Sequence, residues 1–171
     1  MRPHGLIAAL LSALVTLVAM HAAALDQTVQ RMDLGNGVTV TLSMAPFDPE
    51  AHDIVQCASG APCVIDDAPV FGTDGALPTR AVTLLQVRYD ATSVDLDHRG
   101  MFNAWSPFDD DRPHLTVTYR DADGLRLRGS FSDGSAAYVA EWLILGDASI
   151  RTRIDCVECN DPSAFEPKST E

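Results

Sequence analysis

Residues 115–155 read LTVTYRDADGLRLRGSFSDGSAAYVAEWLILGDASIRTRID, and they carry the strongest strand pattern in the chain. Their runs alternate apolar with polar residues or are rich in β-branched and aromatic side chains, both of which are typical of strands. Turn-forming residues such as Asp121-Ala122-Asp123-Gly124 separate the runs. We expect strands at Leu115–Arg120, Leu125–Arg128, Ala137–Leu145 and Ser149–Asp155, with the most apolar one, Ala137–Leu145, at the centre of a sheet.

The run Ala136–Leu145 has a competing interpretation as a helix, because its alanines and Glu141 favour helices. A strand is preferred, since the 3.6-residue apolar period of helices is almost absent from the chain. In a strand Glu141 points to the opposite face from Trp142, so we expect its carboxylate to be exposed. The arginines of 125–128 and 149–155 are expected to face acidic neighbours across the strands.

The strand pattern also extends upstream. Asn36-Gly37 supplies the positive φ angles of a tight hairpin turn between strands at Val29–Leu34 and Val38–Leu42. Further strands are expected at Ala81–Tyr89 and Ser93–Asp97. Together these segments predict an all-β fold, a single antiparallel β-sandwich or barrel of about 7–9 strands.

Residues 45–78 differ in composition from the rest. They contain five prolines and several glycines, and proline removes the donors of a strand ladder. We expect a long loop with short strands at Ile54–Cys57 and Cys63–Ile65. Long loops on a compact domain often carry function.

The two ends of the chain do not look like parts of the fold. Arg2, the apolar run Leu6–Met20 and His21-Ala22-Ala23-Ala24 follow the order of a secretory signal peptide, cleaved after Ala24. The apolar run is shorter than the roughly 20 residues that a membrane span needs, so we expect no span after cleavage. The sequence predicts a signal peptide at 1–24, a β-sandwich domain at 25–159, a disordered acidic tail at 160–171, and a periplasmic or secreted location.

The charge balance limits the classes of partner. The chain has 24 acidic residues against 12 Lys and Arg, which gives a net charge of −12. This excludes a nucleic-acid binder that relies on phosphate contacts. The hydrophobic fraction of 46 % excludes a disordered acidic protein. The acidity favours solubility and cationic partners.

Four cysteines form two close pairs, Cys57 with Cys63 and Cys156 with Cys159. Oxidising compartments favour disulfides, so local pairing is the first expectation, although four cysteines allow three connectivities. Cys156-Val157-Glu158-Cys159 could instead be a redox motif, but its acidic neighbours would raise the thiol pKa. Four thiolates could also hold zinc.

Metal sites and catalytic motifs have weaker support. Asp109, Asp110 and Asp111 are the best cation candidates, and Asp121-Ala122-Asp123-Gly124 resembles only the opening of a calcium loop. A soft-metal site would use the histidines and methionines of the domain, namely His52, His98, His114, Met44 and Met101. The chain has no G-x-S-x-G, no H-E-x-x-H and no glycine-rich phosphate loop. We therefore expect no cofactor and favour a binding module over an enzyme.

Two segments are candidate binding surfaces. The first is 100–108, where Trp105 and Phe108 would form an exposed apolar patch or, alternatively, a cover over one end of the sandwich. The second is the turn at 131–138, where Asp133, Ser135 and Tyr138 would contact a partner. The alternative for the second segment is a plain hairpin with Tyr138 packed on the sheet.

The segment Ser135-Ala136-Ala137-Tyr138, followed by Trp142 and Gly146-Asp147, resembles the exported bacterial lysozyme inhibitors. Those are small β-barrels that place a Ser-Gly-type loop and a tyrosine in the lysozyme cleft. The likeness is confined to this segment, and the glycine after the serine is absent here. It implies that an acidic β-domain binds a cationic enzyme. The first hypothesis is therefore an exported, non-enzymatic module that binds a protein or cell-envelope component through end loops; the alternatives are a lysozyme-inhibitor-like protein and a periplasmic metal-binding protein.

Overall fold

The computed structural model describes residues 27–104, 114–120 and 124–157. These residues form strands in three antiparallel sheets, with two single 3-10 turns and no α-helix among them. The predicted all-β class is therefore confirmed. The signal peptide expected at 1–24 and the tail expected at 160–171 lie outside the described residues.

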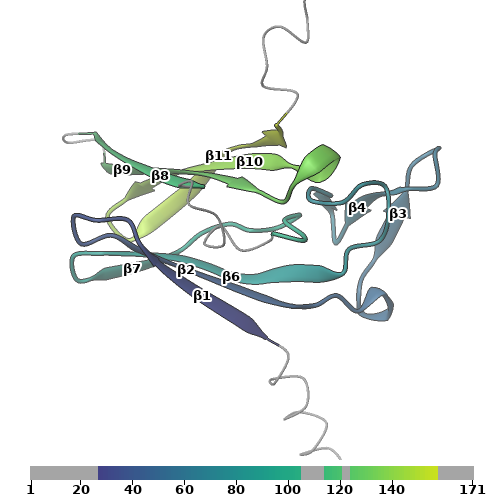
Figure 1. Cartoon of the computed structure of the whole chain (residues 1–171), viewed down its shortest axis with the longest axis horizontal. Helices are drawn as coiled ribbons and strands as arrows, with labels where there is room; N and C mark the ends of the chain where they lie inside the picture. Colours follow the sequence, from purple (N-terminus) through teal and green to yellow (C-terminus); the bar gives the residue numbers. More distant parts are fainter. Residues whose placement is uncertain (1–26, 105–113, 121–123, 158–171) are drawn as a thin grey trace, which may run out of the picture.

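Two four-stranded sheets make up most of the structure (Figure 1). The first sheet has the order β1 (Thr28–Asp33), β2 (Thr39–Pro46), β6 (Arg80–Tyr89), β7 (Thr92–Asp95). The second sheet has the order β11 (Ala148–Cys156), β10 (Tyr138–Leu145), β9 (Gly124–Phe131), β8 (Leu115–Arg120). The sheets lie in two layers and do not close into a barrel.

The hydrophobic core lies between these two layers. Alternate residues of each strand point inward, as the period of two requires. Val40 and Val87 from the first sheet, and Leu127 and Trp142 from the second, have no exposed surface. The apolar area that these side chains remove from water is the main stabilising contribution to the fold.

The strand predicted at Ala137–Leu145, rather than a helix over Ala136–Leu145, is confirmed by β10. It pairs with β9 on one side and β11 on the other, so it is an interior strand, as its apolar composition predicts. The hairpin turn between β1 and β2 is also confirmed. Asn36 and Gly37 have φ angles of 51° and 75°, which an Asn-Gly pair adopts at low cost.

The region 45–78 is more ordered than its proline content predicts. It forms a third sheet of β3 (Ile54–Gln56), β4 (Pro62–Ile65) and β5 (Ala68–Pro69), preceded by the 3-10 turn η1 (Pro49–Ala51). The two short strands expected there are confirmed, and β5 was not predicted. The described residues contain eleven strands in three antiparallel sheets, so the expected all-β class is confirmed but the strand count of about 7–9 is not.

Glu141 is half-buried rather than exposed, which corrects the expectation from alternation alone. Its carboxylate forms an ion pair with Arg126 of β9 and accepts a hydrogen bond from Thr152 Oγ1 of β11 at 3.1 Å. The expected pairing of arginines with acids across strands is confirmed for Arg126. Arg151 instead pairs with Asp97, which follows β7, and Arg153 with Asp155 of its own strand. A charged group on a half-buried face needs such partners, because burial without them costs several kcal/mol.

Residues 96–104, here called the strap, connect all three sheets. The strap is hydrogen-bonded to the first sheet by Val82 N donating to Met101 O at 3.2 Å. It is joined to the second sheet by Trp142 Nε1 donating to Asp97 O at 2.9 Å. Phe71, which follows the third sheet, donates its N–H to Gly100 O at 2.9 Å. The strap therefore fixes the third sheet against the two layers.

Candidate functional site

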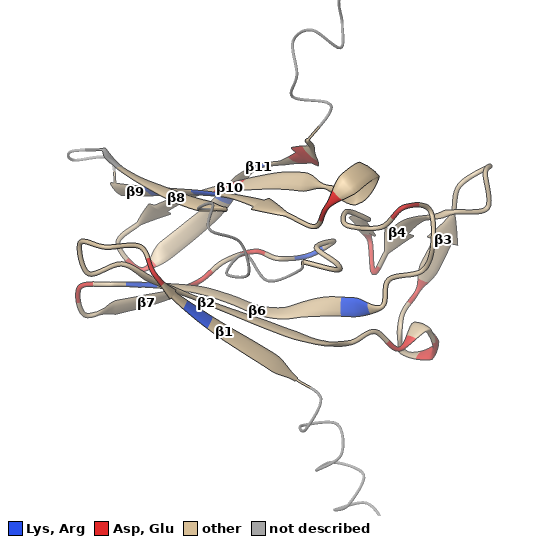
Figure 2. Cartoon of the chain, in the orientation of Figure 1, with Lys and Arg blue, Asp and Glu red and all other residues tan. Residues whose placement is uncertain are grey.

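The third sheet lies at one end of the two layers, away from the β6–β7 and β10–β11 turns (Figure 1). No Lys or Arg occurs between Arg31 and Arg80, so this part of the chain has no cationic side chain except His52 when protonated. Figure 2 shows acidic positions on and around β3, β4 and η1. The acidic residues of this end, here called the acidic end, are Asp48, Glu50, Asp53, Asp66, Asp67 and Asp74.

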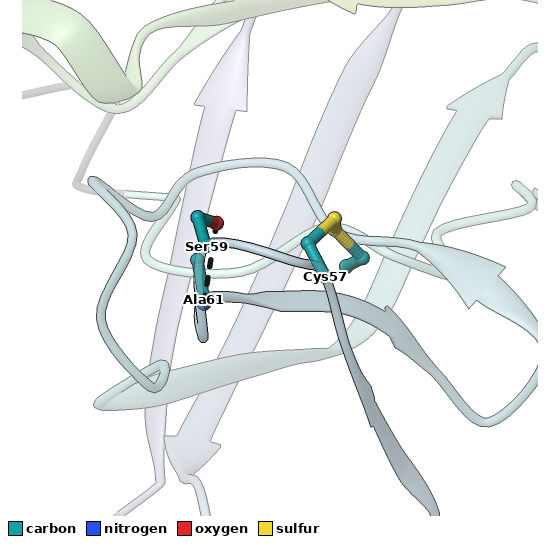
Figure 3. Close-up of a disulfide and its surroundings, with 4 residues drawn as sticks. Cys57, Ser59 and Ala61 are labelled. Carbon is teal, nitrogen blue, oxygen red and sulfur yellow. Dashed lines mark hydrogen bonds between the residues drawn. A yellow bond between two sulfur atoms is a disulfide. The ribbon is translucent and has the colours of Figure 1, made fainter.

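A disulfide closes the hairpin between β3 and β4 (Figure 3). The predicted pair Cys57–Cys63 is confirmed, with a Cα–Cα distance of 5.4 Å. Inside the loop Cys57 N donates to Ala61 O at 2.8 Å, and Ala61 N donates to Ser59 Oγ at 3.5 Å. No described cysteine is free. Cys156 lies at the end of β11, and its predicted partner Cys159 lies outside the described residues.

His52 and Asp66 form an oriented pair on the third sheet. His52 Nδ1 lies 2.5 Å from Asp66 Oδ2, and Asp53 N donates to Asp66 Oδ1 at 3.0 Å. The His52 ring stacks on Phe47, with ring centroids 4.7 Å apart. The hydrogen bonds from His52 and from the Asp53 backbone lower the pKa of Asp66. The ionised carboxylate thus holds the imidazole in one orientation and leaves Nε2 as its second polar atom.

A small cleft of about 210 Å³ opens between the third sheet and the strap. Its polar lining comes from His52 and Asp66 on one side and from His98 and Arg99 of the strap on the other. Its apolar lining includes Ile65 and other core residues. Ligand pockets for drug-sized molecules usually have volumes of about 300–1,000 Å³. This cleft therefore has room for one side chain or a very small molecule.

Asp97 of the strap has the most strongly perturbed carboxyl group near the cleft. The hydrogen bonds from the Arg99 side chain, helped by the Arg99 backbone and the charge of Arg151, lower the pKa of Asp97 to about 2. Arg99 Nη2 lies 2.9 Å and Arg151 Nη2 lies 3.5 Å from Asp97 Oδ2. The pair with Arg151 links the strap to β11, so ionised Asp97 stabilises the attachment of the strap.

This pKa shift predicts a pH dependence of stability. A carboxyl group whose pKa is lower in the folded state stabilises that state above its unfolded pKa of 3.8, and this contribution disappears as pH falls toward about 2. We expect Asp97→Asn to lower the free energy of unfolding at pH 7. The difference from wild type should shrink between pH 3.8 and about 2. Urea unfolding of wild type and Asp97→Asn across this pH range measures the difference in free energy of unfolding. A difference that does not change with pH would contradict a stabilising role of the Asp97 charge.

The structure places the residues of the predicted turn surface in different environments. Ser135 in the 3-10 turn η2 (Gly134–Ala136) and Asp133, which precedes the turn, are exposed, and η2 lies at the same end of the molecule as the third sheet (Figure 1). Tyr138 is only 1 % exposed. Its ring stacks on Phe131 with centroids 5.4 Å apart and lies 6.0 Å from Phe71. Tyr138 is a core residue, because a ring at this position fills the junction between the second and third sheets.

The apolar candidates Trp105 and Phe108, and the cation candidates Asp109, Asp110 and Asp111, lie outside the described residues. Met101, Phe102 and Ala104, which precede them, are buried. Among the described residues no group of three His, Cys, Asp or Glu side chains is placed to hold a metal ion. No helix in the described ranges is long and apolar enough to cross a membrane.

The pairing of His52 with Asp66 was not predicted from the sequence. The two residues are 14 positions apart and meet only because β3 and β4 form a hairpin. The one available signal was Asp66-Asp67, since adjacent aspartates favour tight turns and here both adopt positive φ. Comparison with known proteins finds no matching family model, no matching curated protein and no matching solved structure.

Proposed function

We propose that this protein is an exported, non-enzymatic binding module that holds a cationic protein against its acidic end. The observation that carries the proposal is a local excess of acid: residues 47–79, which form η1 and the third sheet at one end, contain six acidic residues and no Lys or Arg (Figure 2). Arg80 at the start of β6 borders this end, and Arg99 lines its cleft. Export is supported by the signal-peptide pattern at 1–24 and by the Cys57–Cys63 disulfide.

The acidic end also offers apolar contact area. Val55 of β3 is 53 % exposed and Leu77, which follows the third sheet, is 48 % exposed. Asp133 and Ser135 on η2 add polar groups on the same end of the molecule. Specific interfaces combine apolar contacts with a polar rim, and aliphatic stems of Lys and Arg can cover side chains such as Val55. The cleft beside His52 has room for one side chain of the partner.

The partner is identified by charge complementarity. Each exposed ion pair contributes only about 0–1 kcal/mol, so the affinity requires several pairs acting together. The summed field of the acidic residues accelerates the encounter with a cationic surface and disfavours acidic partners. A lysozyme is one cationic protein of this kind, and the resemblance of 135–147 to exported lysozyme inhibitors favours it as the first probe.

Paired neutralising variants test the location of the site. Glu50→Gln with Asp53→Asn removes two charges at the acidic end, and Asp90→Asn with Asp147→Asn removes two at the opposite end. We expect wild type to bind a cationic lysozyme in a salt-sensitive manner, measured by biolayer interferometry. The first variant should bind about fivefold more weakly and the control like wild type, because exposed pairs contribute about 0.5 kcal/mol each.

Two outcomes would contradict the proposal. Equal weakening by both variants would show a response to net charge and no site at this end. Absence of binding to lysozyme and to polylysine at low salt would show that the acidic end does not hold cationic proteins. Asp48 and Asp66 are left unchanged, because Asp48 caps η1 through the Glu50 N–H and Asp66 orients His52.

A further inference from the structure

A polar hollow of about 150 Å³ lies on the outer face of the first sheet, which is the face turned away from the core. It is formed by strands β1, β2, β6 and β7. The inward neighbours of its lining residues, Val40, Val87 and Val94, are buried, so the lining side chains point outward. The hollow is lined by Arg31, Thr39, Thr41, Gln86, Arg88 and Ser93.

The strand register explains how this group assembles. One row across the sheet reads Arg31, Thr41, Gln86, Asp95, and the adjacent row reads Asp33, Thr39, Arg88, Ser93. Strands lie about 4.8 Å apart, so each row brings side chains from four strands within reach of one another. Arg31 and Arg88 stand in different rows with the hydroxyls of Thr39 and Thr41 between them. The two guanidinium groups can therefore reach one ligand from two sides.

The arginines of this hollow have no acidic partner among the residues that the structure describes. Neither Arg31 nor Arg88 forms an ion pair or a side-chain hydrogen bond with any described residue. The carboxylates at the ends of the two rows, Asp33 and Asp95, do not line the hollow, although Asp95 is hydrogen-bonded to its lining residue Gln86. Asp33 Oδ1 accepts from Gly35 N at 2.8 Å, and Asp95 Oδ1 accepts from Gln86 Nε2 at 2.7 Å. In a chain of net charge −12, this leaves two free cations beside two hydroxyl donors.

We propose that this hollow binds a phosphate or sulfate group. The planar guanidinium fork matches the oxygens of such an anion in a bidentate manner, and charge-assisted hydrogen bonds of this kind are the stronger ones. Thr39 and Thr41 hydroxyls donate to further oxygens. Ser93 and the Gln86 carbonyl oxygen contact hydroxyl groups of a molecule that carries the anion. This anion site is independent of the acidic end, for which we propose a cationic partner.

The test is a titration of the full exported chain with inorganic phosphate, inorganic sulfate and glucose 6-phosphate, followed by calorimetry and by NMR of the Thr39 and Thr41 amides. Arg31→Gln and Arg88→Gln each should weaken binding at least tenfold. Arg128→Gln is the matched control, because it removes one charge from an exposed arginine on the second sheet. Thermal melts of all variants verify that the fold is intact.

The outcomes separate the possible ligands. Tighter binding of glucose 6-phosphate than of inorganic phosphate supports an anion carried on a sugar, and equal binding supports a site for the free anion. If wild type binds saturably but Arg128→Gln weakens binding as much as Arg88→Gln does, the binding results from overall charge and the proposed site is wrong. Absence of saturable binding of all three probes to wild type, or amide shifts that avoid Thr39 and Thr41, would also overturn it.

Discussion

Replacing Tyr138 with alanine is expected to lower the free energy of unfolding by about 3–5 kcal/mol, the usual cost of removing a large buried ring. The side chain is 1 % exposed and contacts Phe131 and Phe71. Its hydroxyl lies 3.4 Å from Phe102 O, and burial raises the pKa of this hydroxyl above its ordinary value. The loss of ring contacts and the cavity left behind account for most of the expected effect.

Urea unfolding measures this loss, and Tyr138→Phe is the matched control. The phenylalanine keeps the ring and removes only a long hydrogen bond, so we expect a loss of about 1 kcal/mol or less. Lysozyme binding by the folded fraction of Tyr138→Ala should be unchanged if Tyr138 acts only in the core. A Tyr138→Ala protein that is as stable as wild type but binds lysozyme more weakly would restore the sequence-based hypothesis that Tyr138 contacts the partner.

Alternation and turn chemistry were sufficient to predict the two large sheets. Val40 and Val87 alternate with polar residues, the run around Trp142 is apolar apart from Glu141, as is typical of an interior strand, and Asn36-Gly37 specifies a hairpin by itself. These features depend on residues close in sequence. Tyr138 shows the limit of such reasoning. An aromatic residue after a small-residue turn is compatible with either an exposed or a buried ring, and the contacts with Phe71 and Phe102, which are distant in sequence, distinguish them.

The third sheet and both candidate sites depend on contacts between distant residues. Prolines at 46, 49, 62, 69 and 78 favoured a loop, yet they lie at strand ends, in η1 or in connections, where the ladder needs no donor from them. His52 meets Asp66 through a hairpin, and Arg31 and Arg88 come to line one hollow from strands on either side of β2. The register of the strands determines which of these residues become neighbours, and no local pattern in the sequence encodes that register.

Gly72→Ala is expected to lower the free energy of unfolding by about 2–5 kcal/mol, from left-handed strain and overpacking together. Gly72 has a φ of +90°, and a Cβ atom there would overlap the carbonyl oxygen of Phe102 and lie 2.9 Å from Tyr138 Cε1. Gly72 O also accepts a hydrogen bond from Asn103 Nδ2 at 2.9 Å. The substitution would therefore push the third sheet away from the strap at the same junction that Tyr138 fills.

Gly75→Ala separates the two causes of this effect. Gly75 has a similar φ of +75°, but its added Cβ would meet only Ala61 Cβ at 3.8 Å, so it carries the conformational strain without the overlap. We expect Gly75→Ala to cost about 1–2 kcal/mol and Gly72→Ala to cost more in the same urea titration. Equal losses would show that the strap and the third sheet can separate without penalty. The cleft beside His52 lies between the strap and the third sheet. A larger loss of stability for Gly72→Ala than for Gly75→Ala would therefore show that the packing that stabilises this junction also determines the shape of the cleft.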